Sequence, residues 1–124
     1  MPAPAVTTLD ADRSDLVALA VDGHLTADDY ERVVDPVVEA AARAHGAFDL
    51  LIRFDRLDGF SLGAAKEDAA LAKHLGSMRR MALVGAPGWM TRLADVLGAL
   101  APVEVEAFGS EAEARDWLRA PETA

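Results

Sequence analysis

Short apolar runs alternate along the chain with longer segments in which apolar residues return at helical spacing. Three of these runs have the composition of strands covered on both faces, and they comprise residues 16–21, 48–54 and 81–84. Residues 103–108 alternate between apolar and polar, as in a half-buried strand. Residues 6–9 form a short first run, and the polar residues after it predict a hairpin into the second run. Asp22 and Gly23 are expected to end that second strand.

The first helical segment has clear signals at both ends. Thr26 is a good N-cap, and Asp29 stands three residues later as a short version of the capping box. Gly46 occupies the position of a glycine that ends a helix. Pro36 lies inside the segment, and because proline has no N–H, we expect a kink or a restart there. The pattern therefore predicts one interrupted helix between Thr26 and Gly46.

Three further helices are predicted between and after the later strands. One covers residues 62–75, and another begins near Trp89 and stops before Pro102. The last opens at Ser110, which with Glu113 forms a capping box. The order is ββαβαβαβα, and helical crossovers favour parallel pairing between the strands that they join. The sequence thus predicts an α/β fold with a mixed, mainly parallel sheet, an initial antiparallel hairpin and about four helices.

Length and composition limit the classes of protein that fit. The 124 residues suit a single domain over 1–124, with a loose tail at about 119–124. A net charge of −9 disfavours binding to nucleic acid. The sequence has no cysteine, no secretory signal pattern and no apolar run long enough to span a membrane, so we expect a cytoplasmic protein. The three histidines are scattered and match no metal-binding spacing, so no metal site is expected. No cofactor is expected either.

The segment after the run at 48–54 is the first candidate site. Gly59, Phe60, Ser61 and Leu62 are expected between the end of a strand and the start of a helix, where open α/β sheets commonly bind ligands. The segment matches neither a P-loop nor a dinucleotide-binding turn. We favour the interpretation that Ser61 caps the helix and Gly59 permits the turn. A ligand-binding or switching role is the alternative.

The helix near Trp89 is the second candidate site. Leu93 and Leu97 belong to its core stripe, while Trp89 and Met90 widen the apolar surface beyond one packed face. These four residues are candidates for the wall of a cavity or exposed groove. A wide stripe that only faces the core explains the pattern equally well.

Four stretches of the chain together carry a family resemblance. They comprise residues 23–39, which begin G-H-L-T-A-D-D-Y, residues 50–60 with the adjoining 62–68, residues 81–89 and residues 103–118. In this order they resemble the SpoIIAA-like family of the STAS fold, whose shape is also compared with the Sec14 or CRAL-TRIO lipid-carrying domains. The resemblance implies a bacterial intracellular domain without established catalysis.

The resemblance also implies two functional hypotheses. The leading one is a non-enzymatic binding or regulatory module that holds a small nonpolar molecule or lipid, or that contacts a protein partner. Membrane contact would be peripheral at most, and a second copy of the chain is one candidate partner. The alternative is an interaction switch of the anti-sigma-factor-antagonist type, in which Ser61 is phosphorylated. The family's aspartate-serine pair is absent, since the turn reads L57-D-G-F-S-L-G63. Residues 59–63 have the spacing G-x-S-x-G of a nucleophile elbow, but a hydrolase is disfavoured because no serine, histidine and acid constellation is evident in the sequence.

Overall fold

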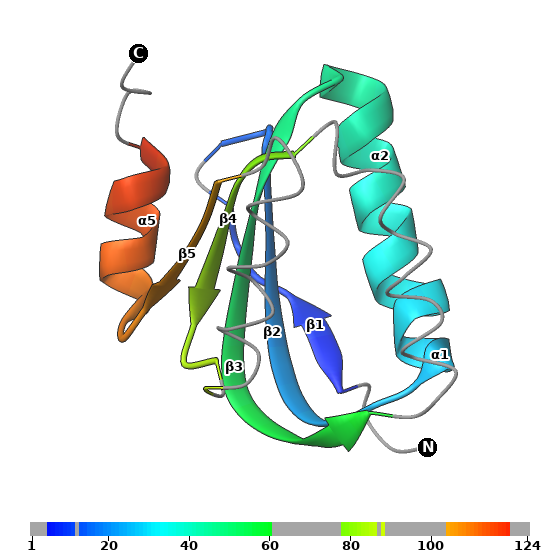
Figure 1. Ribbon diagram of the computed structural model, residues 1–124. Coiled ribbons are helices and arrows are strands. Elements are labelled where there is room, and N and C mark those ends of the chain that lie inside the picture. The colour runs from blue at the N-terminus through cyan, green and yellow to red at the C-terminus, as the bar shows by residue number, and fades with distance from the viewer. Residues whose placement is uncertain (1–4, 12, 61–77, 87, 89–103, 120–124) are drawn as a thin grey trace.

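A five-stranded sheet forms the centre of the computed structural model, which describes residues 5–11, 13–60, 78–86, 88 and 104–119 (Figure 1). In spatial order, which is also chain order, the strands are β1 (Val6–Thr8), β2 (Leu16–Leu25), β3 (Phe48–Phe60), β4 (Met78–Val84) and β5 (Glu104–Phe108). β1 pairs with β2 in antiparallel fashion, and every other neighbouring pair is parallel. The predicted mixed sheet with an initial hairpin is confirmed, and the three apolar runs are its inner strands.

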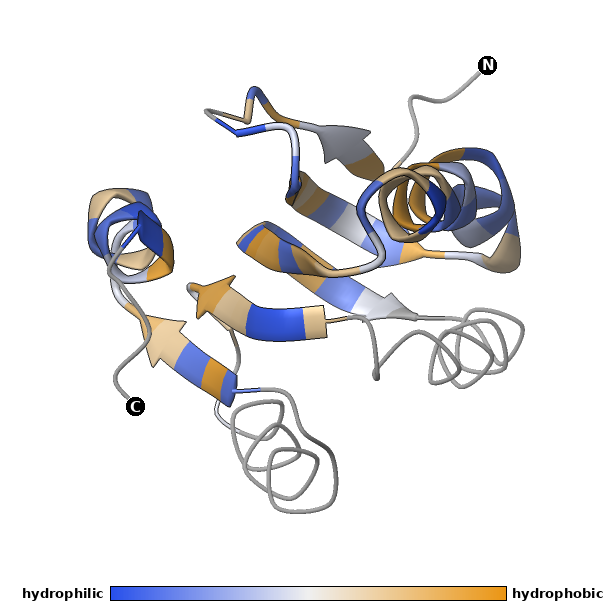
Figure 2. Cartoon of the chain, turned by 90° about the horizontal axis from the view of Figure 1, so that it is seen from above, coloured by the Kyte–Doolittle hydropathy of each residue, from blue (hydrophilic) through white to orange (hydrophobic). Residues whose placement is uncertain are grey.

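Helices lie on both faces of this sheet. One face is covered by a nearly continuous helical segment, made of α1 (Ala27–Asp29), the π-helical η1 (Tyr30–Val34) and α2 (Asp35–His45). Figure 2 shows α5 (Glu111–Arg119) on the opposite face. Helix cover on both sides explains why the inner strands are apolar throughout. The helices predicted at 62–75 and near Trp89 lie outside the described residues.

The first helical segment begins, breaks and ends where the sequence predicts. The Thr26 N–H donates to Asp29 Oδ2 at 2.9 Å, and the Asp29 N–H donates back to Thr26 Oγ1 at 3.4 Å, which completes the capping box. Because Pro36 has no N–H for the preceding turn, the segment forms a π-helical turn in which the Asp35 N–H donates to the Tyr30 carbonyl. Gly46 ends the helix with a φ of 70°.

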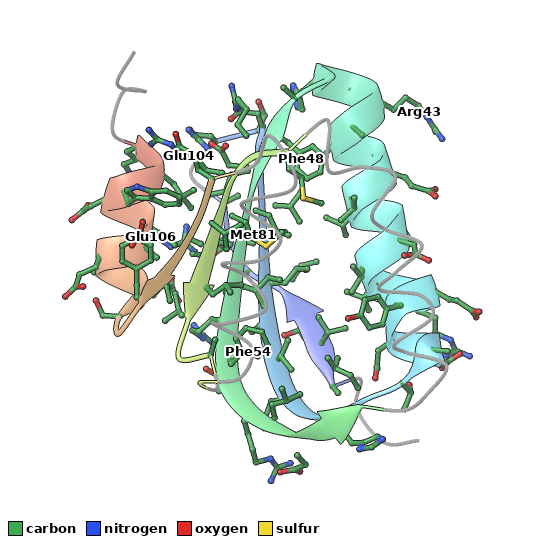
Figure 3. The ribbon with its side chains drawn as sticks, in the orientation of Figure 1. Arg43, Phe48, Phe54, Met81, Glu104 and Glu106 are labelled. Atoms are coloured by element: carbon green, nitrogen blue, oxygen red, sulfur yellow. The ribbon has the colours of Figure 1, made fainter. Side chains whose placement is uncertain are left out.

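Two apolar clusters form the core, one on each face of the sheet. Phe48, which is fully buried, lies in the cluster beneath α2, and the partly buried Met81 and Phe54 pack against the same cluster (Figure 3). Leu51, also fully buried, lies in the smaller cluster beneath α5, together with Leu118. Leu50 belongs to the first cluster, so the adjacent residues Leu50 and Leu51 of β3 serve opposite clusters, as the alternation of side chains along a strand requires.

β2 and β3 continue past their predicted ends, and this corrects the sequence interpretation. β2 runs through Asp22 and Gly23 to Leu25, and β3 runs through Gly59 to Phe60, so residues 55–60 are strand and not loop. Irregularities in the pairing follow Val21 and Gly23. Such bulges let two strands stay paired through residues that favour turns.

Candidate functional site

The continued part of β2 and β3 projects beyond β4 at the carboxyl-terminal edge of the sheet. We call residues 22–25 and 55–60 the β2–β3 extension. Within it, Gly23 pairs with Leu57, His24 with Gly59, and Leu25 with Phe60. The last pairing of β3 with β4 is Arg53 with Val84, so among the described strands the extension is only two strands wide. Figure 1 shows the two strands curving away together below the end of β4.

Two glycines give the extension its shape. Gly59 has a φ of +151°, and a Cβ placed there would lie 3.4 Å from His24 Nδ1. Gly23 has a φ of +121°, and its Cβ would lie 3.5 Å from Arg56 Nη2. Residues with a side chain rarely adopt such φ values. The glycines therefore allow the bulged pairing and bring the His24 ring against the β3 backbone.

Charged side chains cover part of this extension. Arg56 Nε lies 3.2 Å from Asp22 Oδ1 and 3.4 Å from Asp58 Oδ2. The three side chains are 64%, 66% and 55% exposed, respectively. Ion pairs this exposed stabilise a fold by about 0–1 kcal/mol. These charges therefore form a solvated surface and contribute little to the stability of the sheet.

The structure places two of the predicted site residues in this extension. Gly59 and Phe60 are its last two residues on β3, where they pair with His24 and Leu25. The other predicted residues, Ser61, Leu62, Trp89, Met90, Leu93 and Leu97, lie outside the described residues. Sequence reasoning missed His24, and the available signal was the Asp-Gly dipeptide that occurs in both strands, at 22–23 and 58–59. The extra, unpaired residues of the irregular pairing both lie in β3, at Asp55 and Asp58.

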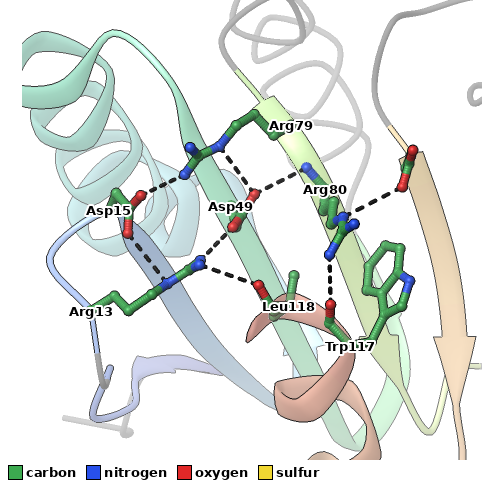
Figure 4. A network of polar contacts seen from close by, with 8 residues as sticks. Arg13, Asp15, Asp49, Arg79, Arg80, Trp117 and Leu118 are labelled. Carbon is green, nitrogen blue, oxygen red and sulfur yellow. Dashed lines mark hydrogen bonds and ion pairs between the residues drawn. The ribbon is translucent and has the colours of Figure 1, made fainter. Parts of the chain in front are cut away.

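A second polar cluster lies at the opposite, amino-terminal edge of the parallel strands (Figure 4). At its centre is Asp49, whose side chain is only 5% exposed. Asp49 accepts a hydrogen bond from Arg13 Nη2, accepts the Arg80 backbone N–H at 3.2 Å and lies 3.5 Å from Arg79 Nε. Asp15 in turn accepts from Arg79 Nη2 and lies 3.3 Å from Arg13 Nε. The hydrogen bond from Arg79 is the main cause that lowers the pKa of Asp15.

This Asp49 network holds the carboxyl-terminal end of α5. Arg13 Nη1 donates to the Leu118 carbonyl at 3.2 Å, and Arg80 Nη1 donates to the Trp117 carbonyl at 2.6 Å. The Arg80 guanidinium also lies 5.1 Å from the centre of the Trp117 ring, within cation–π range. These donors satisfy carbonyls that the last turn of a helix leaves unpaired. A structural role, holding the end of α5 against the sheet, therefore explains the Asp49 network.

The amino-terminal end of α5 is also held by arginines. Arg53 Nη1 and Arg115 Nε each lie 2.8 Å from a Glu111 oxygen. The hydrogen bond from Arg53, followed by that from Arg115, lowers the pKa of Glu111. Hydrogen bonds to Asp55 and Glu111 raise the pKa of Arg53. Arginine side chains thus hold both ends of α5 against the sheet.

In residues 5–60, 78–88 and 104–119, apart from positions 12 and 87, no group of three or more histidine, aspartate or glutamate side chains is placed to hold a metal ion. None of the helices in the described part of the chain is long and apolar enough to cross a membrane.

Comparison with known proteins places the chain in a family. The SpoIIAA-like family model matches residues 16–119, which include β2 to β5 and both helical segments. The chain belongs to the SpoIIAA-like family. A protein from Shewanella loihica, described as uncharacterized with a SpoIIAA-like fold, is 30% identical with a TM-score of 0.76, and the match covers 95% of this chain and 97% of that one. No curated protein matches the sequence.

Two other solved structures share the SpoIIAA-like fold at lower identity. The anti-sigma factor antagonist SpoIIAA in its unphosphorylated form is 15% identical with a TM-score of 0.68, covering 94% of this chain and all (100%) of that one. The Bacillus cell fate determinant SpoIIAA in its phosphorylated form is 19% identical with a TM-score of 0.57, covering 93% of this chain and 100% of that one. At these identities the likeness shows the fold alone.

Proposed function

We propose that this SpoIIAA-like domain is a non-enzymatic, cytoplasmic regulatory module that binds a protein partner through the β2–β3 extension. The observation that carries the proposal is the projection of two strands beyond β4, with exposed charged side chains on them. An anti-sigma factor antagonist of the same fold acts, by its description, on another protein. The exposed, charged side chains of the extension favour a protein as the partner.

The charges of the extension favour a protein over a nonpolar ligand at this position. Asp22 and Asp58 flank Arg56, so the exposed side chains carry a net negative charge. A partner with a cationic group would gain two carboxylates at once, and complementary charges mainly speed and orient association. A nonpolar molecule or lipid would need the apolar surface predicted on Trp89, Met90, Leu93 and Leu97, and that hypothesis stays a prediction.

Charge reversal tests the proposed surface. Asp22→Lys with Asp58→Lys should weaken capture of the partner. The matched control is Glu113→Lys with Asp116→Lys on α5, which makes the same change in net charge at two exposed positions of another element. The partner is first identified by affinity purification with the wild-type domain, and binding is then measured with purified components. Equal affinity for the double variant and the control contradicts the proposal.

Control by phosphorylation at Ser61 is the second candidate function. Ser61 directly follows Phe60, the last residue of β3, so it adjoins the end of the extension. A phosphate there, three residues after Asp58 in the sequence, would add about two negative charges and change the surface offered to a partner. Intact-mass spectrometry of protein purified from its native cells should show a phosphate-sized increase that Ser61→Ala removes. The same spectra would reveal a retained lipid, which supports the nonpolar-ligand hypothesis instead.

A further inference from the structure

We propose that the outer edge of β5 binds an extended peptide with basic residues at alternate positions, which adds to the sheet as a further strand. β5 is the last strand in the sheet order, and no described strand pairs with its outer side. Figure 1 shows it as one border of the sheet, next to α5. An edge strand presents unpaired N–H and C=O groups that a second chain can use. This surface is separate from the β2–β3 extension.

The hydrogen bonds of β5 identify the backbone groups that point outward. The Gly85 N–H donates to the Phe108 carbonyl at 3.1 Å, so the backbone groups of Phe108 face β4. Backbone groups of successive strand residues point alternately to the two sides. Glu104 and Glu106 therefore also face β4 with their backbone, and Val105 and Ala107 present N–H and C=O at the outer edge. A peptide strand would pair with these two residues.

The side chains beside this edge carry negative charge. Glu104 and Glu106 pair in register with Arg80 and Ala82 of β4, so both glutamate side chains lie on the face that bears α5 (Figure 3). Both residues are exposed, and Glu104 Oε2 lies 3.4 Å from Arg80 Nε. An added strand would place every second side chain next to this pair of glutamates. Lysine or arginine at those positions would meet opposite charge.

An aromatic pair continues the same face at the end of β5. The rings of Phe108 and Trp117 are 5.5 Å apart at an interplanar angle of 47°, and both residues are half-buried. In Figure 4 the Trp117 indole lies between Arg80 and β5. An apolar residue of the peptide would bury the remaining exposed area of these rings. The edge thus favours a peptide with alternating basic residues followed by an apolar one.

The opposite edge of the sheet provides a contrast. β1 has three residues, and its exposed positions are Thr7 and Thr8. The Leu9 N–H donates to the Ala18 carbonyl, so by the same alternation the Thr8 backbone points outward. This edge carries no acidic side chain within β1.

A second copy of the chain is a poor occupant for the β5 edge. Two glutamate-bearing edges, on chains that each have a net charge of −9, would repel each other.

The test is an NMR titration of the full chain, labelled with nitrogen-15. The probe is a synthetic peptide of three Lys-Val repeats followed by phenylalanine, and the control peptide has glutamate in place of lysine. The Val105 and Ala107 amide signals should shift and exchange more slowly with the lysine peptide alone. Ala107→Pro removes an outward donor and should abolish these effects, whereas Thr8→Pro, the matched change on the β1 edge, should not. Proline is tolerated where a strand N–H faces outward.

A charge variant gives an independent test that leaves the backbone unaltered. Glu106→Lys should weaken binding of the lysine peptide by about two- to fivefold, the range for one exposed charge pair. Glu31→Lys on the other face of the sheet is its control. Equal binding of both peptides, an absence of shifts at Val105 and Ala107, or insensitivity to both β5 variants overturns the proposal. Self-association that Ala107→Pro removes would also overturn it, because the occupant would then be a second copy.

Discussion

Replacing Asp49 by asparagine should destabilise the protein more than any other single neutralised carboxylate discussed above. The substitution keeps the shape of the side chain and an oxygen to accept the Arg80 N–H, but it removes the buried negative charge. Taking one partner from a buried ion pair typically costs about 3–5 kcal/mol. Arg13 and Arg79 are 31% and 38% exposed and both retain Asp15, so water and that carboxylate compensate part of the loss. We therefore expect the lower end, about 3 kcal/mol.

Urea denaturation followed by circular dichroism measures this loss. Asp58→Asn is the matched control, because it removes the same charge from an exposed pair with Arg56 and should change the free energy of unfolding by at most about 1 kcal/mol. Since the Asp49 network holds the Trp117 and Leu118 carbonyls, amides near the end of α5 should also exchange faster in Asp49→Asn. Equal free energies of unfolding for the two variants would refute the reasoning about the network.

Two further predictions concern acid stability and the glycine of the extension. Folding lowers the pKa values of Asp15 and Glu111 from their ordinary values of 3.8 and 4.5. Both carboxylates therefore stabilise the fold fully at a pH above those ordinary values. This stability is lost as the pH falls through their lower folded pKa values. Acid titration of the free energy of unfolding should show this loss, and Glu111→Gln should reduce it. Gly59→Ala should cost about 1–3 kcal/mol in thermal or urea unfolding because of its positive φ, while Gly109→Ala, which meets open space, should be nearly neutral.

Local signals in the sequence predicted the parts of the fold that depend on near neighbours. Thr26 and Asp29 form the capping box three residues apart, and Pro36 interrupts the helix through its own missing N–H. The inner strands followed from continuous apolar runs, because burial on both faces leaves no polar alternation. Such features need only a few consecutive residues, so one sequence suffices to recognise them.

The β2–β3 extension could not be predicted in the same way. Asp22-Gly23 and Asp58-Gly59 are ordinary turn signals when each is read alone. Both dipeptides stay within strands because β2 and β3, which are distant in sequence, pair with each other there, and β3 takes up the irregularity as bulges at Asp55 and Asp58. The candidate residues Gly59 and Phe60 were therefore placed in a loop, whereas they end a strand.

The Asp49 network was missed for a related reason. Its members are single charges near the beginnings of separate elements, and only the parallel topology brings those beginnings to one edge of the sheet. The available signal was a charged residue next to an apolar strand segment: Asp49 adjoins Phe48, and Arg80 adjoins Met81. That pattern indicates that the charges are paired, although it does not identify the partners.

Site-specific photo-crosslinking in cells tests the proposed function most directly. His24 is exposed on the extension, and a photoreactive residue in its place should form an adduct with one protein. Mass spectrometry of the crosslinked peptide identifies that protein. The same residue in place of Asp116 on α5 should form no such adduct. A discrete adduct from position 24 that Asp58→Lys reduces is the result that a protein-binding β2–β3 extension predicts. An adduct of equal yield from both positions, or none from position 24, would contradict it.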